Sequence, residues 1–87
     1  MPTVKLFTKQ QCPRCPQAKQ LCSGLEQDAC SVVSYDVETA DGLAEAAFFG
    51  VQATPTIIVE DDAENVVAEF RGQVPAREEL LKAIGVR

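Results

Sequence analysis

The motif Cys12-Pro13-Arg14-Cys15 separates two segments with different hydrophobic periods, and this junction restricts the fold more than any other feature of the sequence. Residues 4–8, before it, alternate and are rich in β-branched and aromatic side chains, which predicts a strand. After it, apolar residues recur at steps of three and four: Ala18, Leu21, Cys22, Leu25 and Ala29. This spacing predicts an amphipathic helix. We expect both cysteines on its first turn, with Pro13 at the first helical position and Pro16 within the same turn.

The remaining segments continue the alternation of strands and helices. We predict further strands at residues 31–37, 56–59 and 66–70, and further helices at residues 43–49 and 76–84. Thr39 or Asp41 is the candidate N-cap of the helix at 43–49, and Gly50 suits its C-terminal end. Phe48 and Phe49, near that end, are expected to pack in the core, with exposure of one of the two as the alternative.

The order of these elements predicts the fold class. Strands joined by helices pair in parallel, whereas the last two strands form an antiparallel hairpin across the polar turn at residues 61–65. The order β-α-β-α-β-β-α therefore predicts an α/β fold with a four-stranded mixed sheet flanked by three helices. We interpret residues 1–87 as a single domain.

Charge and composition argue against several classes of function. The net charge of -5 disfavours nucleic-acid binding. There is no run of 18 apolar residues, so we expect no transmembrane helix. Residues 1–7 lack the pattern of a signal peptide, so we expect a cytoplasmic protein, and we expect it to be a monomer. Histidine is absent, which excludes an imidazole base and any Cys/His metal site.

A dithiol at the start of a helix suits thiol–disulfide exchange. The thiolate is the reactive form, and an unperturbed cysteine with a pKa of about 8.5 is little ionised near neutral pH. A helix N-terminus favours negative charge by roughly 0.3–1 kcal/mol, and the side chains of Lys9 and Arg14 add positive potential. We assign Cys12 as the exposed nucleophile and Cys15 as the more shielded resolving thiol. Such a redox-active pair requires no cofactor.

Other interpretations of the cysteines remain open at this point. The pair could bind a metal ion or serve an interaction module whose dithiol is idle. Cys22 falls on the apolar stripe of the helix and is expected in the core. A helix continuing from Cys22 to Cys30 would separate them by roughly 10–12 Å, which disfavours both a disulfide and a four-thiolate metal site unless the helix ends early.

Thr54-Pro55 is the second candidate functional motif. A proline between a helix end and an apolar strand often does no more than start the strand. The sequence by itself does not determine whether the bond before Pro55 is cis or trans.

Taken together, these motifs resemble the thioredoxin/glutaredoxin superfamily over nearly the whole chain. The first strand, the Cys12-Pro13-Arg14-Cys15 motif, Thr54-Pro55, the hairpin and the last helix follow that family's order and spacing. The resemblance implies a thioredoxin fold and protein disulfides as substrates. It also implies that Pro55 is cis and lies beside the dithiol, and that the Thr54 backbone pairs with an extended substrate segment.

Residues near the motif and after the hairpin resemble different branches of the superfamily. Residues 7–15 are similar to glutaredoxins, with Cys-Pro-x-Cys and Lys9 three residues upstream. Leu6 stands about where typical thioredoxins carry a buried acid. However, residues 70–75 lack the Gly-Gly pair and following acid of glutathione-binding glutaredoxins. The resemblance therefore implies a glutaredoxin-like small thioredoxin reduced by a thioredoxin-reductase-type flavoenzyme, with a glutathione-dependent glutaredoxin as the alternative.

Overall fold

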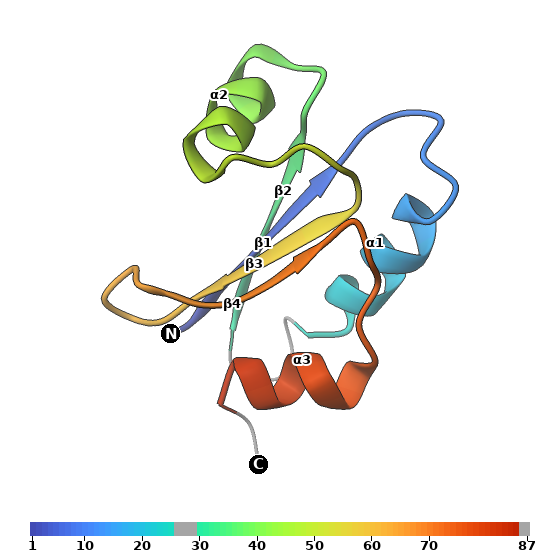
Figure 1. Ribbon diagram of the computed structural model, residues 1–87. Coiled ribbons are helices and arrows are strands. Elements are labelled where there is room, and N and C mark those ends of the chain that lie inside the picture. Colours follow the sequence, from blue (N-terminus) through green and yellow to red (C-terminus); the bar gives the residue numbers. More distant parts are fainter. Residues whose placement is uncertain (26–29, 86–87) are drawn as a thin grey trace.

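The computed structural model describes residues 1–25 and 30–85 of the 87-residue chain (Figure 1). The elements, in chain order, are β1 (Thr3–Thr8), α1 (Cys15–Ser23), β2 (Ser31–Asp36), α2 (Ala40–Phe49), β3 (Thr56–Glu60), β4 (Val66–Arg71) and α3 (Arg77–Ala83). This order is the predicted one. Within the described residues, no helix is long and apolar enough to cross a membrane.

The four strands form one mixed sheet in the order β2-β1-β3-β4. β1 pairs in parallel with β2 and antiparallel with β3, and β3 pairs antiparallel with β4. β3 is buried along its whole length, as expected of an inner strand that has helices on both faces. The predicted α/β fold class with its four-stranded mixed sheet is confirmed.

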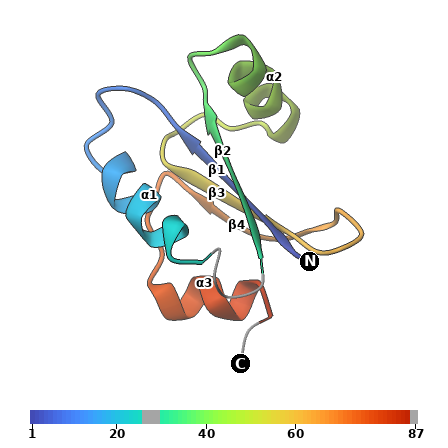
Figure 2. The same ribbon diagram turned by 180° about the vertical axis from the view of Figure 1, so that it is seen from behind.

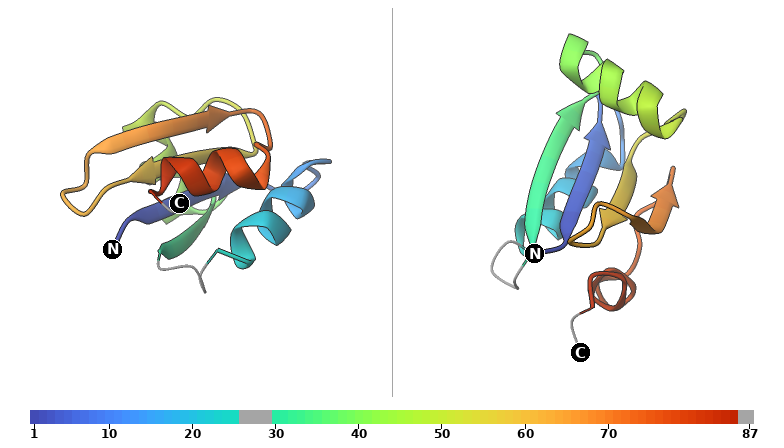
Figure 3. Two further views of the ribbon diagram at one scale, coloured as in Figure 1. Left: turned by 90° about the horizontal axis from the view of Figure 1, so that it is seen from below. Right: turned by 90° about the vertical axis from the view of Figure 1, so that its left-hand side faces the viewer.

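The helices divide the core into two layers (Figures 1 and 3). α1 and α3 cover one face of the sheet, and the buried side chains between them are Val4, Leu6, Ala18, Cys22, Leu25, Ile57, Val59 and Leu80. α2 covers the other face through Ala46, which packs with Phe7 and Ile58. The view from behind in Figure 2 shows α1 and α3 on the side of the sheet away from α2.

The start of α1 differs from the prediction. The helix begins at Cys15, with Arg14 as its N-cap residue, so Cys12 and Pro13 lie in the preceding turn. A helix starting at Pro13 would put Pro16 at its fourth position, where the backbone N–H must bond to the carbonyl of Cys12. Proline has no such donor, whereas at the second position of the observed helix none is needed. The Cys15 amide bonds to the Cys12 carbonyl instead, at 3.3 Å.

The ends of the other helices follow local capping chemistry. α1 ends at Ser23 and does not continue toward Cys30, while Ala29, predicted on its apolar stripe, lies outside the described residues. α2 begins at Ala40, and the Gly42 amide donates to the Thr39 hydroxyl at 3.0 Å, which identifies Thr39 as the N-cap. Gly50 is left-handed with a φ of 66°, as predicted for the residue that ends this helix.

The two phenylalanines at the end of α2 have different environments. Phe49 is half-buried, and its ring centroid lies 6.1 Å from that of Phe7. Phe48 is 81% exposed, so of the two expected arrangements the one with a single exposed phenylalanine is correct. Ala46 and Phe49 are three residues apart and share the face of α2 that points at the sheet, whereas Phe48 is turned about 100° from Phe49 around the helix.

Candidate active site around the Cys12–Cys15 disulfide

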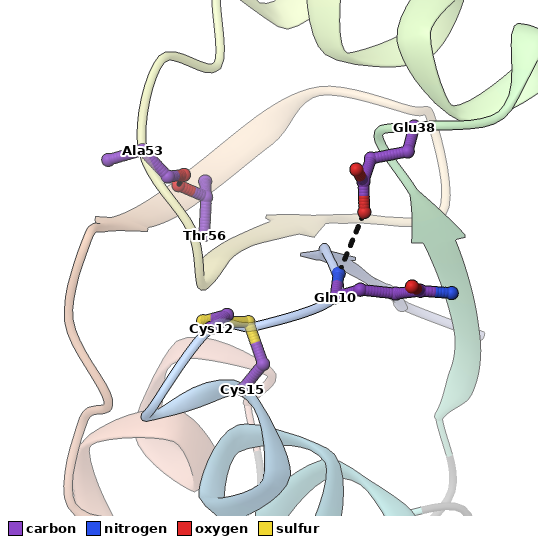
Figure 4. The surroundings of a disulfide bond; sticks show 6 residues. All are labelled: Gln10, Cys12, Cys15, Glu38, Ala53 and Thr56. Atoms are coloured by element: carbon purple, nitrogen blue, oxygen red, sulfur yellow. Dashed lines mark hydrogen bonds between the residues drawn. A yellow bond between two sulfur atoms is a disulfide. The ribbon is translucent and has the colours of Figure 1, made fainter.

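Three loops meet at one edge of the sheet. The register pairs Phe7 with both Tyr35 and Thr56, so the loops after β1 and β2 and the loop before β3 leave the sheet side by side. These loops carry the two cysteines, Glu38 and Thr54-Pro55, respectively (Figure 4). The topology of the sheet therefore brings together the two motifs that the sequence analysis selected.

Cys12 and Cys15 form a disulfide across the turn that leads into α1, with their Cα atoms 5.3 Å apart. Cys12 is 8% exposed and Cys15 is 2% exposed. Cys12 is thus the more accessible residue of the pair, in the predicted order, but the prediction of an exposed Cys12 is wrong for this disulfide form.

The charged side chains beside the motif reach solvent. Lys9, Pro13 and Arg14 are all exposed, and Arg14 begins α1 through its carbonyl, which accepts from the Ala18 amide at 3.1 Å. α1 has no acidic residue in its first turn, so the positive end of its dipole is not offset there. The arrangement favours negative charge on the sulfurs at the start of the helix.

Glu38 is a site residue that the sequence analysis missed. Its carboxylate accepts a hydrogen bond from the Gln10 amide at 2.9 Å, two residues before Cys12 (Figure 4). A second bond between the same loops joins the Val37 amide to the Thr8 carbonyl at 2.9 Å. The predicted parallel pairing of the first two strands could have identified it. Residues that follow two neighbouring parallel strands lie at the same edge of the sheet, so Glu38 is expected beside the segment after Thr8.

The loop held by Glu38 has an unusual backbone conformation. Gln11, directly before Cys12, has a φ of 58°, a left-handed value that costs a non-glycine residue roughly 1–2 kcal/mol. Tertiary contacts must maintain such a conformation. The Glu38–Gln10 bond is one such contact, and it fixes the direction from which the chain enters the disulfide.

The loop before β3 contains a cis peptide bond between Thr54 and Pro55, as the family resemblance implies. Pro55 is buried and Thr54 is half-buried. The Thr56 hydroxyl donates to the Ala53 carbonyl at 2.7 Å and thereby closes the loop around the two residues. Figure 4 shows this segment facing the disulfide.

A shallow hollow of about 170 Å³ adjoins this loop. It is lined by Lys9, Val37, Leu43, Ala46, Val51, Gln52, Ala53 and Thr54. Most of these side chains are apolar, and Lys9 supplies a positive charge. The hollow is suited to an apolar side chain of an extended segment that lies along Thr54.

The other two cysteines belong to the core. Cys22 and Cys30 are outside the disulfide and are 1% and 2% exposed, in the layer covered by α1 and α3. The Cys30 thiol donates to the Leu25 carbonyl at 3.3 Å, and burial raises the pKa of the Cys22 thiol to about 11, with Cys30 adding to the rise. The predicted core position of Cys22 is confirmed. In residues 1–25 and 30–85, no group of three or more His, Cys, Asp or Glu side chains is placed to hold a metal ion.

Known proteins resemble this chain in sequence and in fold. Residues 3–85 match the family profile of the thioredoxin domain. The chain is 34% identical over 62 residues to a probable thioredoxin of Archaeoglobus fulgidus. The matched residues cover 70% of this chain and 68% of that relative. It is 29% identical over 85 residues to a thioredoxin of Methanocaldococcus jannaschii, covering 97% and 93% of the two chains. The structure of a mutant thioredoxin from Halobacterium salinarum superposes with a TM-score of 0.82 at 23% identity, over 95% of this chain and 71% of that one.

The mixed sheet, the disulfide before α1 and the cis-proline loop define a thiol–disulfide oxidoreductase with a thioredoxin fold. The chain belongs to the thioredoxin family. The predicted superfamily is therefore confirmed, and the redox-active group of this family is the disulfide itself.

Proposed function

We propose that the protein reduces disulfides of other proteins by dithiol exchange, with Cys12 as the attacking thiol and Cys15 as the resolving thiol. In the reduced protein, the Cys12 thiolate attacks one sulfur of the substrate disulfide, a mixed disulfide forms, and the other substrate sulfur leaves as a thiolate. Cys15 then loses its proton and attacks the Cys12 sulfur. The Cys12–Cys15 disulfide forms, the second substrate thiolate leaves, and two electrons have passed to the substrate.

The difference in accessibility between the two cysteines carries this assignment. Cys12 is the more exposed of the pair, and Cys15 lies inside the first turn of α1, where a substrate disulfide does not reach it. Lys9 and Arg14 are exposed on either side of Cys12 and favour its thiolate over the neutral thiol. Pro13 shapes the turn between the two cysteines.

Substrate recognition is proposed at the cis-proline loop. The backbone of Thr54 is placed to pair with an extended segment that carries the substrate disulfide, a form of strand addition. The adjoining hollow, with Leu43 and Val51 in its lining, receives a neighbouring apolar side chain. Protein disulfides in flexible, extended segments are the substrate class that this arrangement favours.

The segment after β4 supports a protein reductant over glutathione. Arg71, the last residue of β4, is engaged: its guanidinium donates to the carbonyls of Phe49 and Gly50 at 2.8 and 3.0 Å and pairs with Glu69. Residues 72–76, which follow, contain no carboxylate to bind the amino group of glutathione. We therefore propose a thioredoxin-reductase-type flavoenzyme as the electron donor, for a monomer of this single domain acting in the cytoplasm.

Reduction of insulin by dithiothreitol, followed as turbidity, tests the activity. Wild type and Cys22→Ala are expected to accelerate it, because both retain the dithiol, and Cys12→Ser is expected to show no acceleration. In a second arm, NADPH with a thioredoxin reductase is compared with glutathione, NADPH and glutathione reductase. Turnover with the first system alone supports the proposed donor. Efficient turnover with glutathione would instead show a glutaredoxin.

A further inference from the structure

Beyond its first turn, which carries Asp41, the surface of α2 that faces away from the sheet is largely apolar. Ala44, Ala47 and Phe48 are all exposed there, and Phe48 is the most exposed large apolar side chain among the described residues. No described element packs on this surface (Figures 1 and 3). Together these side chains make an apolar area larger than a single scattered residue, and such areas are candidates for contact with another molecule. The proposed dithiol chemistry makes no use of it.

Phe48 stands at the rim of a hollow of about 280 Å³ between α2 and the β3–β4 hairpin, here called the Phe48 hollow. Its lining consists of Lys5, Glu45, Phe48, Phe49, Glu60 and Glu64. Three carboxylates and one ammonium group leave it with two negative charges. The two phenylalanine rings meet edge to face, with their centroids 5.0 Å apart, and form an aromatic wall.

The ammonium group of Lys5 is already engaged inside this hollow. It lies 3.3 Å from the Glu60 carboxylate and 4.8 Å from the centroid of the Phe49 ring, and the side chains of Lys5 and Glu60 are only 18% and 8% exposed. Glu45 is more exposed and lies farther from Lys5, at 3.9 Å. Glu64 makes no ion pair with any residue in the described part of the chain. Glu45 and Glu64 are therefore available to a cation that enters from outside.

The geometry points to a docking site for a basic segment of a partner protein. An arginine or lysine side chain of the partner enters the Phe48 hollow, contacts the Glu45 and Glu64 carboxylates, and packs against the aromatic wall. An apolar neighbour in the same segment covers Phe48. Cations bind favourably over aromatic rings, and opposite charges at the rim of an interface fix which partner binds.

The negative charge of this surface favours a basic segment over a second copy of the chain, a nucleic acid or an anionic lipid surface. A second copy docked symmetrically would bring Glu45 and Glu64 of both chains together, and like charges repel at such a contact. Nucleic acids and anionic lipid surfaces are repelled by the same carboxylates. A positively charged segment with an apolar residue matches both properties of the site.

The test uses the oxidised protein, labelled with ¹⁵N, and two blocked peptides, Ac-Gly-Leu-Arg-Leu-Arg-Gly-NH₂ and its counterpart with glutamate in place of arginine. The arginine peptide is expected to shift amide signals of Glu45, Phe48 and Glu64, and the glutamate peptide is not. Phe48→Ser and Glu64→Gln are each expected to raise the dissociation constant of the arginine peptide by about fivefold or more.

A matched control separates this effect from general changes of the surface. Glu78→Gln removes a carboxylate on α3, which covers the other face of the sheet, and is expected to leave the dissociation constant within about twofold. Glu64 has a φ of 64°, which glycine adopts without strain. Glu64→Gly therefore removes the carboxylate without weakening the turn, and it is expected to bind like Glu64→Gln.

Three results would overturn the proposal. The first is equal binding of the two peptides. The second is a binding experiment in which the arginine peptide does not bind at about 1 mM, or in which Phe48→Ser and Glu64→Gln leave its dissociation constant unchanged. The third is concentration-dependent dimerisation of the wild type that Phe48→Ser abolishes, which would show that this surface binds a second copy. Insulin reduction is expected to be the same in all four variants, Phe48→Ser, Glu64→Gln, Glu64→Gly and Glu78→Gln, so a loss of peptide binding is not a loss of the dithiol site.

Discussion

The carboxylate of Glu38 accepts a hydrogen bond from the backbone amide of Gln10 at 2.9 Å. This bond ties the loop that leads into Cys12 to the loop that follows the neighbouring parallel strand. It holds a segment whose next residue, Gln11, is in a left-handed conformation. Glu38 thereby acts on the dithiol through the backbone, as a positioning residue.

Glu38→Ala is expected to slow the reaction of reduced Cys12 with iodoacetamide and insulin reduction by a few-fold, because the loop loses its anchor. The free energy of unfolding should fall by about 0.5–1.5 kcal/mol, the range for one solvent-exposed hydrogen bond. Glu38→Gln keeps an acceptor oxygen, so its reaction rates and its free energy of unfolding should lie between those of Glu38→Ala and the wild type. Glu78→Ala, a carboxylate lost far from the dithiol, serves as the control. Wild-type rates in Glu38→Ala would show that the bond does not position Cys12.

Gly42 allows α2 to start against the loop after β2. A Cβ atom at this position would lie 1.8 Å from the Asp36 carbonyl oxygen, so the backbone must shift to admit it. Gly42→Ala is expected to lower the free energy of unfolding by at least about 3 kcal/mol, measured by urea denaturation. Gly24→Ala is the matched control, since its Cβ would make an ordinary contact at 3.7 Å. Equal stability of the two variants would contradict this view of the α2 start.

The buried thiol of Cys22 makes stability depend on alkaline pH. Its pKa is raised to about 11 in the folded protein, against an ordinary value of 9.0. Between these values the unfolded chain has released the proton while the folded protein retains it, so the free energy of unfolding falls as the pH rises. In the oxidised protein Cys12 and Cys15 do not titrate, which leaves Cys22 and Cys30 as the ionisable thiols.

Cys22→Ala isolates this contribution. Urea unfolding at about pH 8 and about pH 10.5 should show a smaller loss of stability for Cys22→Ala than for the wild type, because the variant has one buried thiol fewer to titrate. The cavity that Cys22→Ala leaves in the core lowers the free energy of unfolding equally at both pH values. Its effect therefore cancels when the two pH values are compared. An identical pH dependence of the two proteins would show that Cys22 does not retain its proton in this range.

We propose that the basic residues beside Cys12 raise its reactivity in the reduced protein. Lys9→Gln and Arg14→Gln are each expected to lower the rate of Cys12 alkylation at neutral pH by about two- to threefold at low salt, with a smaller effect at high salt, because exposed charges are screened. Lys19→Gln, an exposed lysine farther along α1, is the control. Equal effects of all three substitutions would indicate a response to net charge alone.

The sequence predicts much of this fold because its local signals agree with one another. Thr39 and Gly50 carry the capping chemistry that bounds α2, and the structure places both as expected. The start of α1 was misplaced because two requirements compete there. A proline suits a helix start because no backbone N–H donor is needed there. Pro16 lies at such a position only if the helix begins after Pro13.

The features that the sequence did not predict depend on tertiary geometry. Glu38 is 26 residues from Cys12 in the chain, and only the parallel pairing of β1 with β2 brings its loop to the dithiol. By composition alone, the sequence did not determine that Phe48, and not Phe49, is the exposed one of the pair. The exposure of Phe48 follows from the phase of α2 on the sheet, which a short, alanine-rich apolar helix does not determine.

The roles of the two cysteines are the central claim, and trapping of a mixed disulfide tests them most directly. Reduced Cys15→Ser is incubated with insulin, and the products are analysed by mass spectrometry under non-reducing conditions, with Cys12→Ser in parallel. We predict a covalent insulin adduct, mapped to Cys12 and released by dithiothreitol, in Cys15→Ser and none in Cys12→Ser. An adduct on Cys15 in Cys12→Ser, with none in Cys15→Ser, would contradict the assignment of nucleophile and resolving thiol.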